Sequence, residues 1–350
     1  MGLPFFVNGA RTKRDQMVAI DLGSRTTKAV HVQKRGQGYI VTNYMTMDAP
    51  IYAKSLSADL LAEHLKALVQ GLATKTKSVT LAVGVNDSVV RLADMPRIPV
   101  ADMRQAIKFN PKNYLQQDLP NHTFDCYVVP PGATPVAPGQ KQKVLVAGIK
   151  TKLLEDLQEA CKMAGLSADH IVPGLICPVN AFEVAVPESF QNEIVALVDI
   201  GFKSTFVCIL QQGTIVLNRV VSIGSNQLTE GVAESMNISY AEAENIKLGM
   251  PQEVQSQLES QLLPLGRELR ASIDFFEHQN DRAVSRVYLS GGATRSELIL
   301  QYLQTELMVE CATWNPAGAL PNTLPESQAA DFPQAAPQLG VALGAVFAAL

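Results

Sequence analysis

Short apolar stretches separated by polar turns open the chain and predict three strands followed by a helix. Strands are expected at Met17–Ile20, Ala29–Gln33 and Tyr39–Met47. Ser57 then suits the N-cap of a helix whose apolar residues within Leu60–Leu72 recur at a spacing of three and four. The first part of the chain therefore predicts a β-β-β-α unit.

The second half of the chain repeats this order. Strands are expected at Ile194–Asp199, Thr205–Gln211 and Thr214–Ser222, and helices follow them. A short buried strand at Arg286–Leu289 then precedes a helix at Ser296–Leu307. Two such units in one chain predict a mixed α/β protein with two similar lobes.

A segment of different order lies between the two units. It is expected to contain strands at Val79–Val83, Ser88–Met95, Thr123–Val129 and Lys143–Lys150 and helices at Ala101–Asn110 and Lys152–Ala164. Pro111 ends or kinks the first of these helices, and Gly165 stops the second. The stretch Pro130–Gln142 predicts an exposed hairpin loop, and Asn315–Pro337, near the end of the chain, predicts an irregular segment.

Composition argues against several classes of function. The 350 residues include 29 Lys and Arg against 33 Asp and Glu, a net charge of −4, whereas nucleic-acid binding needs concentrated positive charge. The longest apolar run, at residues 339–350, is too short to span a bilayer, and the first residues lack the pattern of a signal peptide. The five cysteines include no Cys-x-x-Cys pair, so we expect reduced thiols in a cytoplasmic protein and no zinc site.

The most informative feature is an internal repeat of ten residues at the end of each first strand. Val18–Thr27 and Ala196–Thr205 share an apolar run, an Asp-x-Gly turn that contains Asp21 or Asp199, a basic residue and two hydroxyls. A single turn of this kind is typical of a tight hairpin. Two of them favour a ligand site, because glycine lets backbone N–H groups approach phosphate oxygens and a carboxylate at a strand end can hold Mg²⁺. Two such loops would clamp a triphosphate.

Glycines mark two further elements. Gly291 and Gly292 follow the apolar strand residues Val287–Leu289. Without a Cβ they would let adenine or ribose lie on the backbone, although a plain strand-to-helix turn is the alternative. Gly340 and Gly344 are four residues apart, which favours close packing of a C-terminal helix over contact with a ligand.

Together these elements resemble the phosphate 1, phosphate 2, adenosine and connect 2 motifs of the actin/Hsp70/sugar-kinase superfamily. Arg219–Thr229 and Tyr240–Lys247 are similar to the R…I..GG…T segment and the Y-x-x-A-E-x-x-K helix of its FtsA/PilM branch. Leu92–Pro96, Asp125–Tyr127 and Val144–Ile149 resemble markers of the domain inserted in PilM proteins. The chain ends at the connect 2 helix, whereas FtsA continues to a membrane-targeting tail. The PilM family is therefore the closer match.

This resemblance implies an α/β, actin-like two-lobed fold of duplicated RNase H-like β-β-β-α-β-α units, with an inserted subdomain of the 1C type. The implied division is a flexible segment at 1–16, a first lobe (1A) at 17–86, the 1C-like subdomain at 87–175, a second lobe (2A/2B) at 176–338 and a connect 2 helix at 339–350 that returns to the first lobe. It also implies a cytoplasmic adaptor of a type IV pilus platform at the inner membrane. Such an adaptor binds a short N-terminal peptide of a PilN-like membrane protein, and it can form a homo-oligomer.

The same resemblance implies ATP and Mg²⁺ between the lobes, with Asp21 and Asp199 organising the metal. The residues that would contact ATP are Gly23, Ser24, Arg25, Thr26, Gly201, Lys203, Ser204, Thr205, Gly224, Ser225, Glu244, Lys247, Gly291, Gly292 and Ala293. Asn180 and Glu183 are candidates to orient an attacking water, although Glu183 also suits a solvated helix face. We expect slow hydrolysis at most, with the nucleotide acting as a conformational ligand.

Two residues depart from the superfamily pattern in the second loop. Phe202 and Lys203 stand where small residues are usual. Phe202 would crowd a γ-phosphate and Lys203 would neutralise one, and the sequence leaves both outcomes open. The alternative functions are an FtsA-like filament protein, a small-molecule kinase of the same superfamily and a scaffold that binds no nucleotide. A kinase would need a carboxylate base at an acceptor hydroxyl, for which no residue has a specific spacing.

Overall fold

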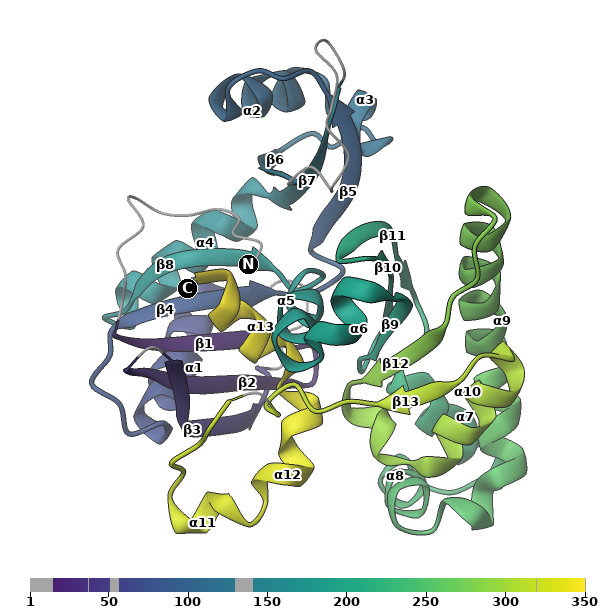
Figure 1. Ribbon diagram of the computed structural model, residues 1–350. Coiled ribbons are helices and arrows are strands. Elements are labelled where there is room, and N and C mark those ends of the chain that lie inside the picture. Colours follow the sequence, from purple (N-terminus) through teal and green to yellow (C-terminus); the bar gives the residue numbers. More distant parts are fainter. Residues whose placement is uncertain (1–14, 37, 51–56, 130–140, 319, 350) are drawn as a thin grey trace. The chain divides into compact units, whose positions relative to one another are not determined.

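The computed structural model describes residues 15–36, 38–50, 57–129, 141–318 and 320–349, and the chain divides into two compact units (Figure 1). The first unit comprises residues 1–181, 318–330 and 341–350, and the second comprises residues 182–317 and 331–340. The predicted hairpin loop at Pro130–Gln142 and the predicted flexible N-terminus lie almost entirely outside the described residues.

A five-stranded sheet forms the centre of the first unit, in the order β3-β2-β1-β4-β8. Its strands are β1 (Gln16–Leu22), β2 (Thr26–Arg35), β3 (Gly38–Asp48), β4 (Ser78–Val83) and β8 (Ser167–Pro173). The first three are antiparallel, and β4 and β8 run parallel to β1. The helices α1 (Ala58–Gly71) and α4 (Thr151–Met163) bury leucines against this sheet. Ser57 caps α1 as predicted, but Leu60 is 41% exposed, so its assignment to the apolar face is wrong.

The sheet of the second unit has the same arrangement, in the order β11-β10-β9-β12-β13. Its strands are β9 (Ile194–Ile200), β10 (Thr205–Gln211), β11 (Thr214–Val221), β12 (Arg286–Ser290) and β13 (Cys311–Thr313). Again three strands are antiparallel and the last two run parallel to the first. The repeat predicted from the sequence is therefore confirmed as a repeat of topology.

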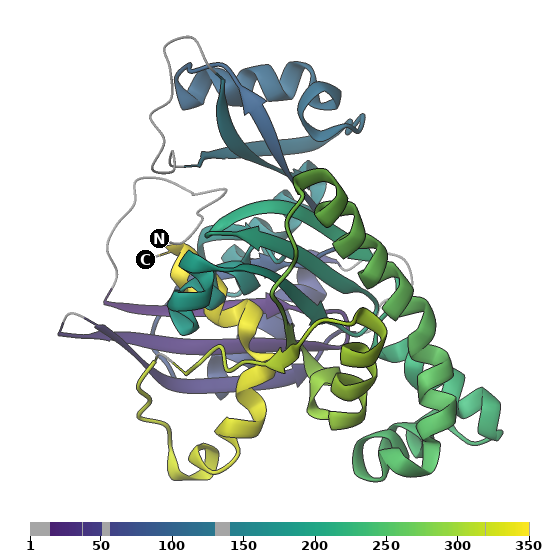
Figure 2. The same ribbon diagram turned by 45° about the vertical axis from the view of Figure 1, so that its right-hand side comes forward.

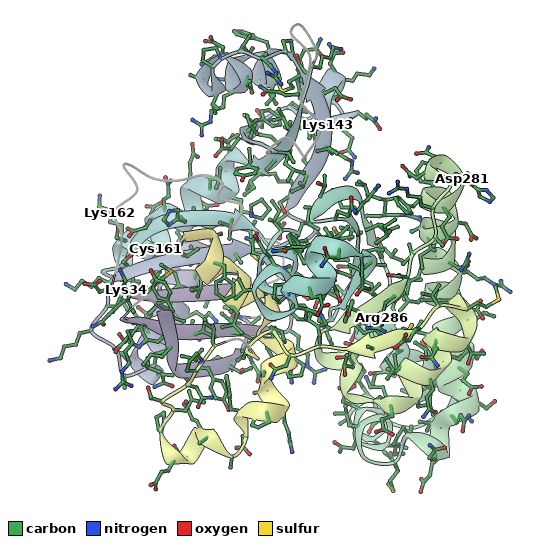
Figure 3. The ribbon with its side chains drawn as sticks, viewed as in Figure 1. Lys34, Lys143, Cys161, Lys162, Asp281 and Arg286 are labelled. Atoms are coloured by element: carbon green, nitrogen blue, oxygen red, sulfur yellow. The ribbon has the colours of Figure 1, made fainter. Side chains whose placement is uncertain are left out.

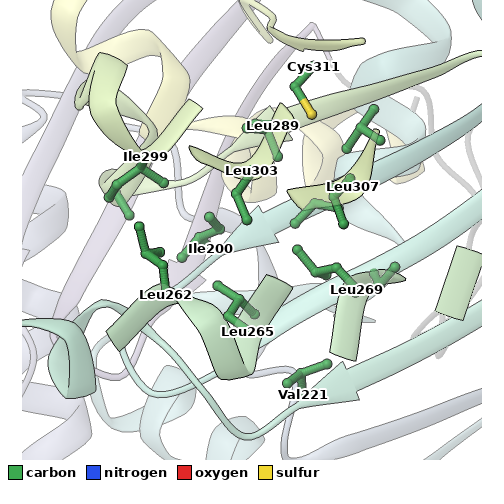
Figure 4. Packing of buried hydrophobic residues seen from close by; sticks show 14 of the residues in the cluster. Ile200, Val221, Leu262, Leu265, Leu269, Leu289, Ile299, Leu303, Leu307 and Cys311 are labelled. Atoms are coloured by element: carbon green, nitrogen blue, oxygen red, sulfur yellow. The ribbon is translucent and has the colours of Figure 1, made fainter. Parts of the chain in front are cut away.

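Helices cover the second sheet and supply most of its core. They are α6 (Pro187–Asn192), α7 (Ser225–Met236), α8 (Tyr240–Gly249), α9 (Gln255–Asn280) and α10 (Glu297–Leu307) with the 3-10 turns η1 (Pro251–Val254) and η2 (Gly292–Arg295). The long α9 runs along the sheet (Figure 2) and buries Leu262, Leu265 and Leu269 against strand residues such as Ile200 (Figure 4). Arg286 begins β12 (Figure 3) and pairs there with Glu310 at 2.9 Å.

A smaller sheet is inserted between β4 and β8. It has the order β5-β7-β6, with the antiparallel strands β5 (Ser88–Met95), β6 (His122–Val128) and β7 (Gln142–Lys150). The helix α2 (Val100–Phe109) packs on β6, and Pro111 begins a separate short helix, α3 (Pro111–Leu115). After β7 the chain continues through α4 to β8. Because β8 pairs with β4, this strand belongs to the first sheet, although it falls within the predicted subdomain at 87–175.

The last part of the chain is more regular than predicted. Residues 315–337, expected to be irregular, include the short helices α11 (Glu326–Ala329) and α12 (Phe332–Ala335), and the 3-10 turn η3 (Ala336–Gln338) follows. The final helix α13 (Gly340–Ala349) lies mostly in the first unit. Among the described residues, no helix combines the length and the apolar character needed to cross a bilayer.

Candidate functional site

The first Asp-x-Gly turn joins β1 to β2 in the first unit. Asp21 is 7% exposed, and the ammonium of Lys28 lies 3.2 Å from its Oδ2, because the antiparallel register sets these residues opposite each other. A side chain at Gly23 would lie 2.4 Å from the carbonyl oxygen of Thr26, so this tight turn requires glycine. The loop thus holds a carboxylate and a cation side by side. The sequence reasoning missed Lys28, since only the strand register brings it to Asp21.

Buried groups of the helix α5 (Cys177–Ala185) lie near this loop. Burial raises the pKa of the Cys177 thiol, and the negative charge of Asp21 raises it further. A side chain at Gly344 of α13 would lie 1.8 Å from the carbonyl oxygen of Cys177, which confirms the predicted packing role of this glycine. Asn180 is 1% exposed and donates to the carbonyl oxygen of Gly344 at 3.3 Å. The Asn180 amide therefore joins α5 to α13, and its role toward water stays a prediction, as does that of Glu183.

The second Asp-x-Gly turn and the Gly-Gly turn meet at one edge of the second sheet. Asp199 of β9 and Ser290 of β12 are paired in register, and the Ser290 hydroxyl donates to Oδ1 of Asp199 at 2.8 Å. Their neighbours Ile200 and Leu289 point into the hydrophobic core (Figure 4). Two motifs separated by some 90 residues are therefore in direct contact. Ser290 is a second residue that the sequence reasoning missed.

The two adjacent glycines of this edge have different roles. Gly291 has a φ of +98°, and a side chain there would lie 2.3 Å from the carbonyl oxygen of Ile200. The Thr294 hydroxyl also donates to the carbonyl oxygen of Gly291 at 2.8 Å. Gly292 is exposed, and the nearest atom to a side chain there is Oε1 of Gln338 at 4.0 Å. Gly291 is therefore required by the fold, whereas Gly292 leaves open backbone that a flat ligand can approach.

The N-terminus of α7 holds the second loop in place. The backbone N–H groups of Ser225 and Asn226 donate to the carbonyl oxygens of Gly201 and Phe202, both at 2.9 Å. A side chain at Gly224 would lie 2.4 Å from the same Phe202 oxygen. The structure thus places the predicted ATP contacts Gly224 and Ser225 against the loop itself.

The hydroxyls that follow this loop are buried. Thr205 is fully buried and its Oγ1 donates to the carbonyl oxygen of Ile223 at 2.7 Å, and Ser204 is 5% exposed. The ammonium-bearing side chain of Lys203 is exposed at the tip. Lys203 is therefore the side chain of this loop that is best placed to meet an anionic ligand from solvent.

Glu244 and Lys247 of α8 form a buried cluster with Thr229 of α7. Lys247 is 3% exposed, and its Nζ lies 2.7 Å from Oε2 of Glu244. The Thr229 hydroxyl donates to Glu244 and accepts from Lys247. These contacts link α8 to α7. Ala293, the last predicted contact, is 7% exposed in the core of the same unit.

A separate groove of about 400 Å³ lies on the inserted sheet and its helices, and we name it the Phe109 groove. Its apolar lining includes Phe109, Pro111, Leu119 and Phe124, and Lys108 borders it. Phe109 is 84% exposed, so it adds exposed apolar surface to this groove.

Metal ligands are sparse in the described part of the chain. It contains no group of three or more His, Cys, Asp or Glu side chains placed to hold an ion. The five cysteines are all buried and free. A metal at Asp21 or Asp199 would therefore need ligands from a bound molecule, as Mg²⁺ bound with a nucleotide has.

The sequence and the fold of the chain are similar to those of known proteins. A family model described as type IV pilus assembly protein PilM matches residues 19–348. A solved structure, the PilM-PilN type IV pilus biogenesis complex, superposes with a TM-score of 0.82 at 22% identity, over 97% of this chain and all of that one. The ethanolamine utilization protein EutJ from Carboxydothermus hydrogenoformans gives a TM-score of 0.56 at 17% identity, over 98% of this chain and 92% of that one. The predicted actin-like α/β fold is thereby confirmed.

A sequence relative supports the FtsA-like branch. The cell division protein FtsA of Bacillus subtilis (strain 168) is 31% identical over 103 residues, which are 29% of this chain. The match spans 22% of the length of that protein.

Proposed function

Because the chain belongs to the family of the type IV pilus assembly protein PilM, we propose that it is a cytoplasmic adaptor of a type IV pilus platform. In this proposal it binds Mg–ATP through its two Asp-x-Gly loops and a PilN-like membrane protein through its inserted sheet. It lies at the inner membrane only through that partner. The observation that carries the nucleotide part is the contact between Asp199 and Ser290, which joins two predicted nucleotide motifs at one sheet edge.

The residues at this edge fit a nucleoside. Gly292 leaves exposed backbone, and a side chain there would meet its nearest atom only at 4.0 Å. An adenosine beside Gly292 would lie one strand away from Asp199, which pairs with Ser290 in register. This spacing supports a nucleotide whose phosphates reach the second loop.

Charged groups in both loops fit the phosphates and their metal. Lys28 in the first unit and Lys203 in the second would each neutralise phosphate oxygens, while Asp21 and Asp199 would hold Mg²⁺. The magnesium ion, when bound, supplies positive charge that offsets the phosphates and fixes their geometry.

The nucleotide acts in this proposal as a conformational ligand. The Asn180 amide donates to the carbonyl oxygen of Gly344, so helix packing fixes the side chain proposed to orient a water. We expect turnover to be slow, and we assign the nucleotide a role in setting the conformation that the partner recognises.

The Phe109 groove is the proposed docking site for the partner. A short peptide of apolar side chains would cover Phe109, which is 84% exposed, and would fill a groove walled by Leu119 and Phe124. The solved PilM-PilN complex, whose fold this chain shares, supports a PilN-like protein as the source of that peptide.

Titration calorimetry with Mg–ATP tests the nucleotide part. The wild-type chain should bind, and Asp199→Ala and Asp21→Ala should each weaken binding about tenfold or more, since each removes a carboxylate that organises the metal. Asp274→Ala is a matched control, because Asp274 pairs with Arg270 within α9. Absence of binding by the wild type, or wild-type affinity in both loop variants, would contradict the proposal.

A further inference from the structure

Asp199 is held by a neutral hydroxyl from the adjacent strand. Ser290 is 2% exposed, and its Oγ lies 2.8 Å from Oδ1 of Asp199. The parallel register of β9 and β12 fixes the two residues side by side. Because a hydroxyl carries no charge, this hydrogen bond restricts the orientation of the carboxylate without neutralising it.

The corresponding aspartate of the first unit is held differently. Asp21 has the ammonium of Lys28 at 3.2 Å, which compensates its charge as well as orienting it. The two aspartates are equivalent in the sequence repeat, yet different side chains hold them, Lys28 at Asp21 and Ser290 at Asp199. This difference points to a specific task for the Ser290 hydroxyl.

We propose that Ser290 is a positioning residue, whose hydroxyl fixes the Asp199 carboxylate in the orientation that binds the magnesium ion of the nucleotide. This inference rests on the proposed function. Hydrogen bonds from outside a metal's ligand set orient its carboxylates, and their loss typically costs 10- to 100-fold in metal affinity.

The same serine connects the metal carboxylate to the turn beside the adenosine. Ser290 directly precedes Gly291, whose backbone lies against the carbonyl oxygen of Ile200, the residue after Asp199. The two strand ends are therefore joined by a hydrogen bond and by a close backbone contact. A nucleoside at Gly292 and a metal at Asp199 would therefore lie at adjacent strand ends that are held together.

Magnesium dependence separates positioning from general stability. ATP binding to the full chain is measured by calorimetry over a range of Mg²⁺ concentrations and again in EDTA, for the wild type, Ser290→Ala, Ser290→Thr and Ser290→Cys. Ser285→Ala is the matched control, since Ser285 donates to the carbonyl oxygen of Ile194 at the opposite end of the same strand pair. Circular dichroism and thermal unfolding check each fold.

Ser290→Ala should raise the Mg²⁺ concentration for half-maximal binding about tenfold, which corresponds to about 1.4 kcal/mol, and leave ATP binding in EDTA unchanged. Ser290→Thr should restore the midpoint, and Ser285→Ala should match the wild type. If Ser290→Ala does not fold, Ser290→Cys keeps the size with a weaker donor and should still raise the midpoint. An unchanged midpoint, or an equal loss in EDTA, overturns the positioning role alone. Failure of the wild type to bind Mg–ATP overturns the proposed function and this inference with it.

Discussion

The ammonium of Lys28 lies 3.2 Å from the carboxylate of Asp21, on the neighbouring strand and opposite it in register. Both side chains are largely shielded, with 16% and 10% exposure. Lys28 therefore compensates the charge of Asp21 before any ligand binds.

Lys28→Met should lower the free energy of unfolding by about 1–3 kcal/mol, because it leaves a shielded carboxylate without its cation. Lys66→Met is the control, since Lys66 pairs with Glu63 on the exposed surface of α1 and should change stability by about 0.5 kcal/mol or less. Urea unfolding measures both. Equal effects of the two substitutions would contradict the structural importance of the Lys28–Asp21 pair.

Gly291→Ala and Gly292→Ala should separate folding from binding. Alanine at Gly291 must adopt a φ near +98° and meets a backbone oxygen at 2.3 Å, so it should cost about 3 kcal/mol of unfolding free energy. Alanine at Gly292 meets open space and should cost about 1 kcal/mol or less, but its methyl group should weaken ATP binding about tenfold.

Urea unfolding and ATP titration of the two variants check this pair. A Gly292→Ala variant with normal ATP affinity would remove the nucleoside from this turn. A Gly291→Ala variant as stable as the wild type would show that the turn does not need its left-handed conformation.

Local patterns were sufficient to predict most of the strands and both Asp-x-Gly turns. The strand β8 was missed, because Asp169 and His170 interrupt its apolar pattern and only its pairing with β4 makes it a strand. The short β13 was missed as well. It has three residues, too few for a pattern, and its pairing with β12 makes it a strand.

The composition of the candidate site was harder to predict than its location. The repeat located Asp21 and Asp199, but Lys28 and Ser290 reach them through strand register, which a single sequence does not display. In the fold the Thr205 hydroxyl donates to the carbonyl oxygen of Ile223, and its role toward a phosphate stays a prediction. Sequence spacing identifies which loops form the site, and the hydrogen bonds within the fold decide which side chains remain for a ligand.

Phe109→Ser should weaken capture of a PilN-like N-terminal peptide about tenfold or more, because it removes the most exposed aromatic wall of the Phe109 groove. Met308→Ser is a matched control, since Met308 is 79% exposed and does not line this groove. Fluorescence anisotropy with a labelled peptide measures both. Full affinity in Phe109→Ser would place the partner elsewhere.

The buried thiols should make the protein less stable in alkali. Burial raises the pKa of Cys126 from 9.0 to about 11 and those of Cys161 and Cys311 to about 12. The folded state thus favours the protonated thiol, so this contribution is complete below about pH 9 and is lost as the pH rises through 11 to 12.

The free energy of unfolding should therefore fall between about pH 9 and pH 12, with each thiol contributing up to about 1.4 kcal/mol per pH unit. Urea unfolding at several pH values measures how steeply the free energy of unfolding falls with pH. Cys161→Ala should make this fall less steep, because it removes one of the thiols that titrate. An identical slope in the wild type and in Cys161→Ala would contradict this account.

A crystal structure of the chain with Mg–ATP, at a concentration that titration shows to be saturating, tests the central claim most directly. The account predicts one nucleotide whose adenosine lies at Gly292 and whose magnesium ion is held by the carboxylates of Asp21 and Asp199. A nucleotide bound away from either aspartate, or crystals without nucleotide under these conditions, would contradict it.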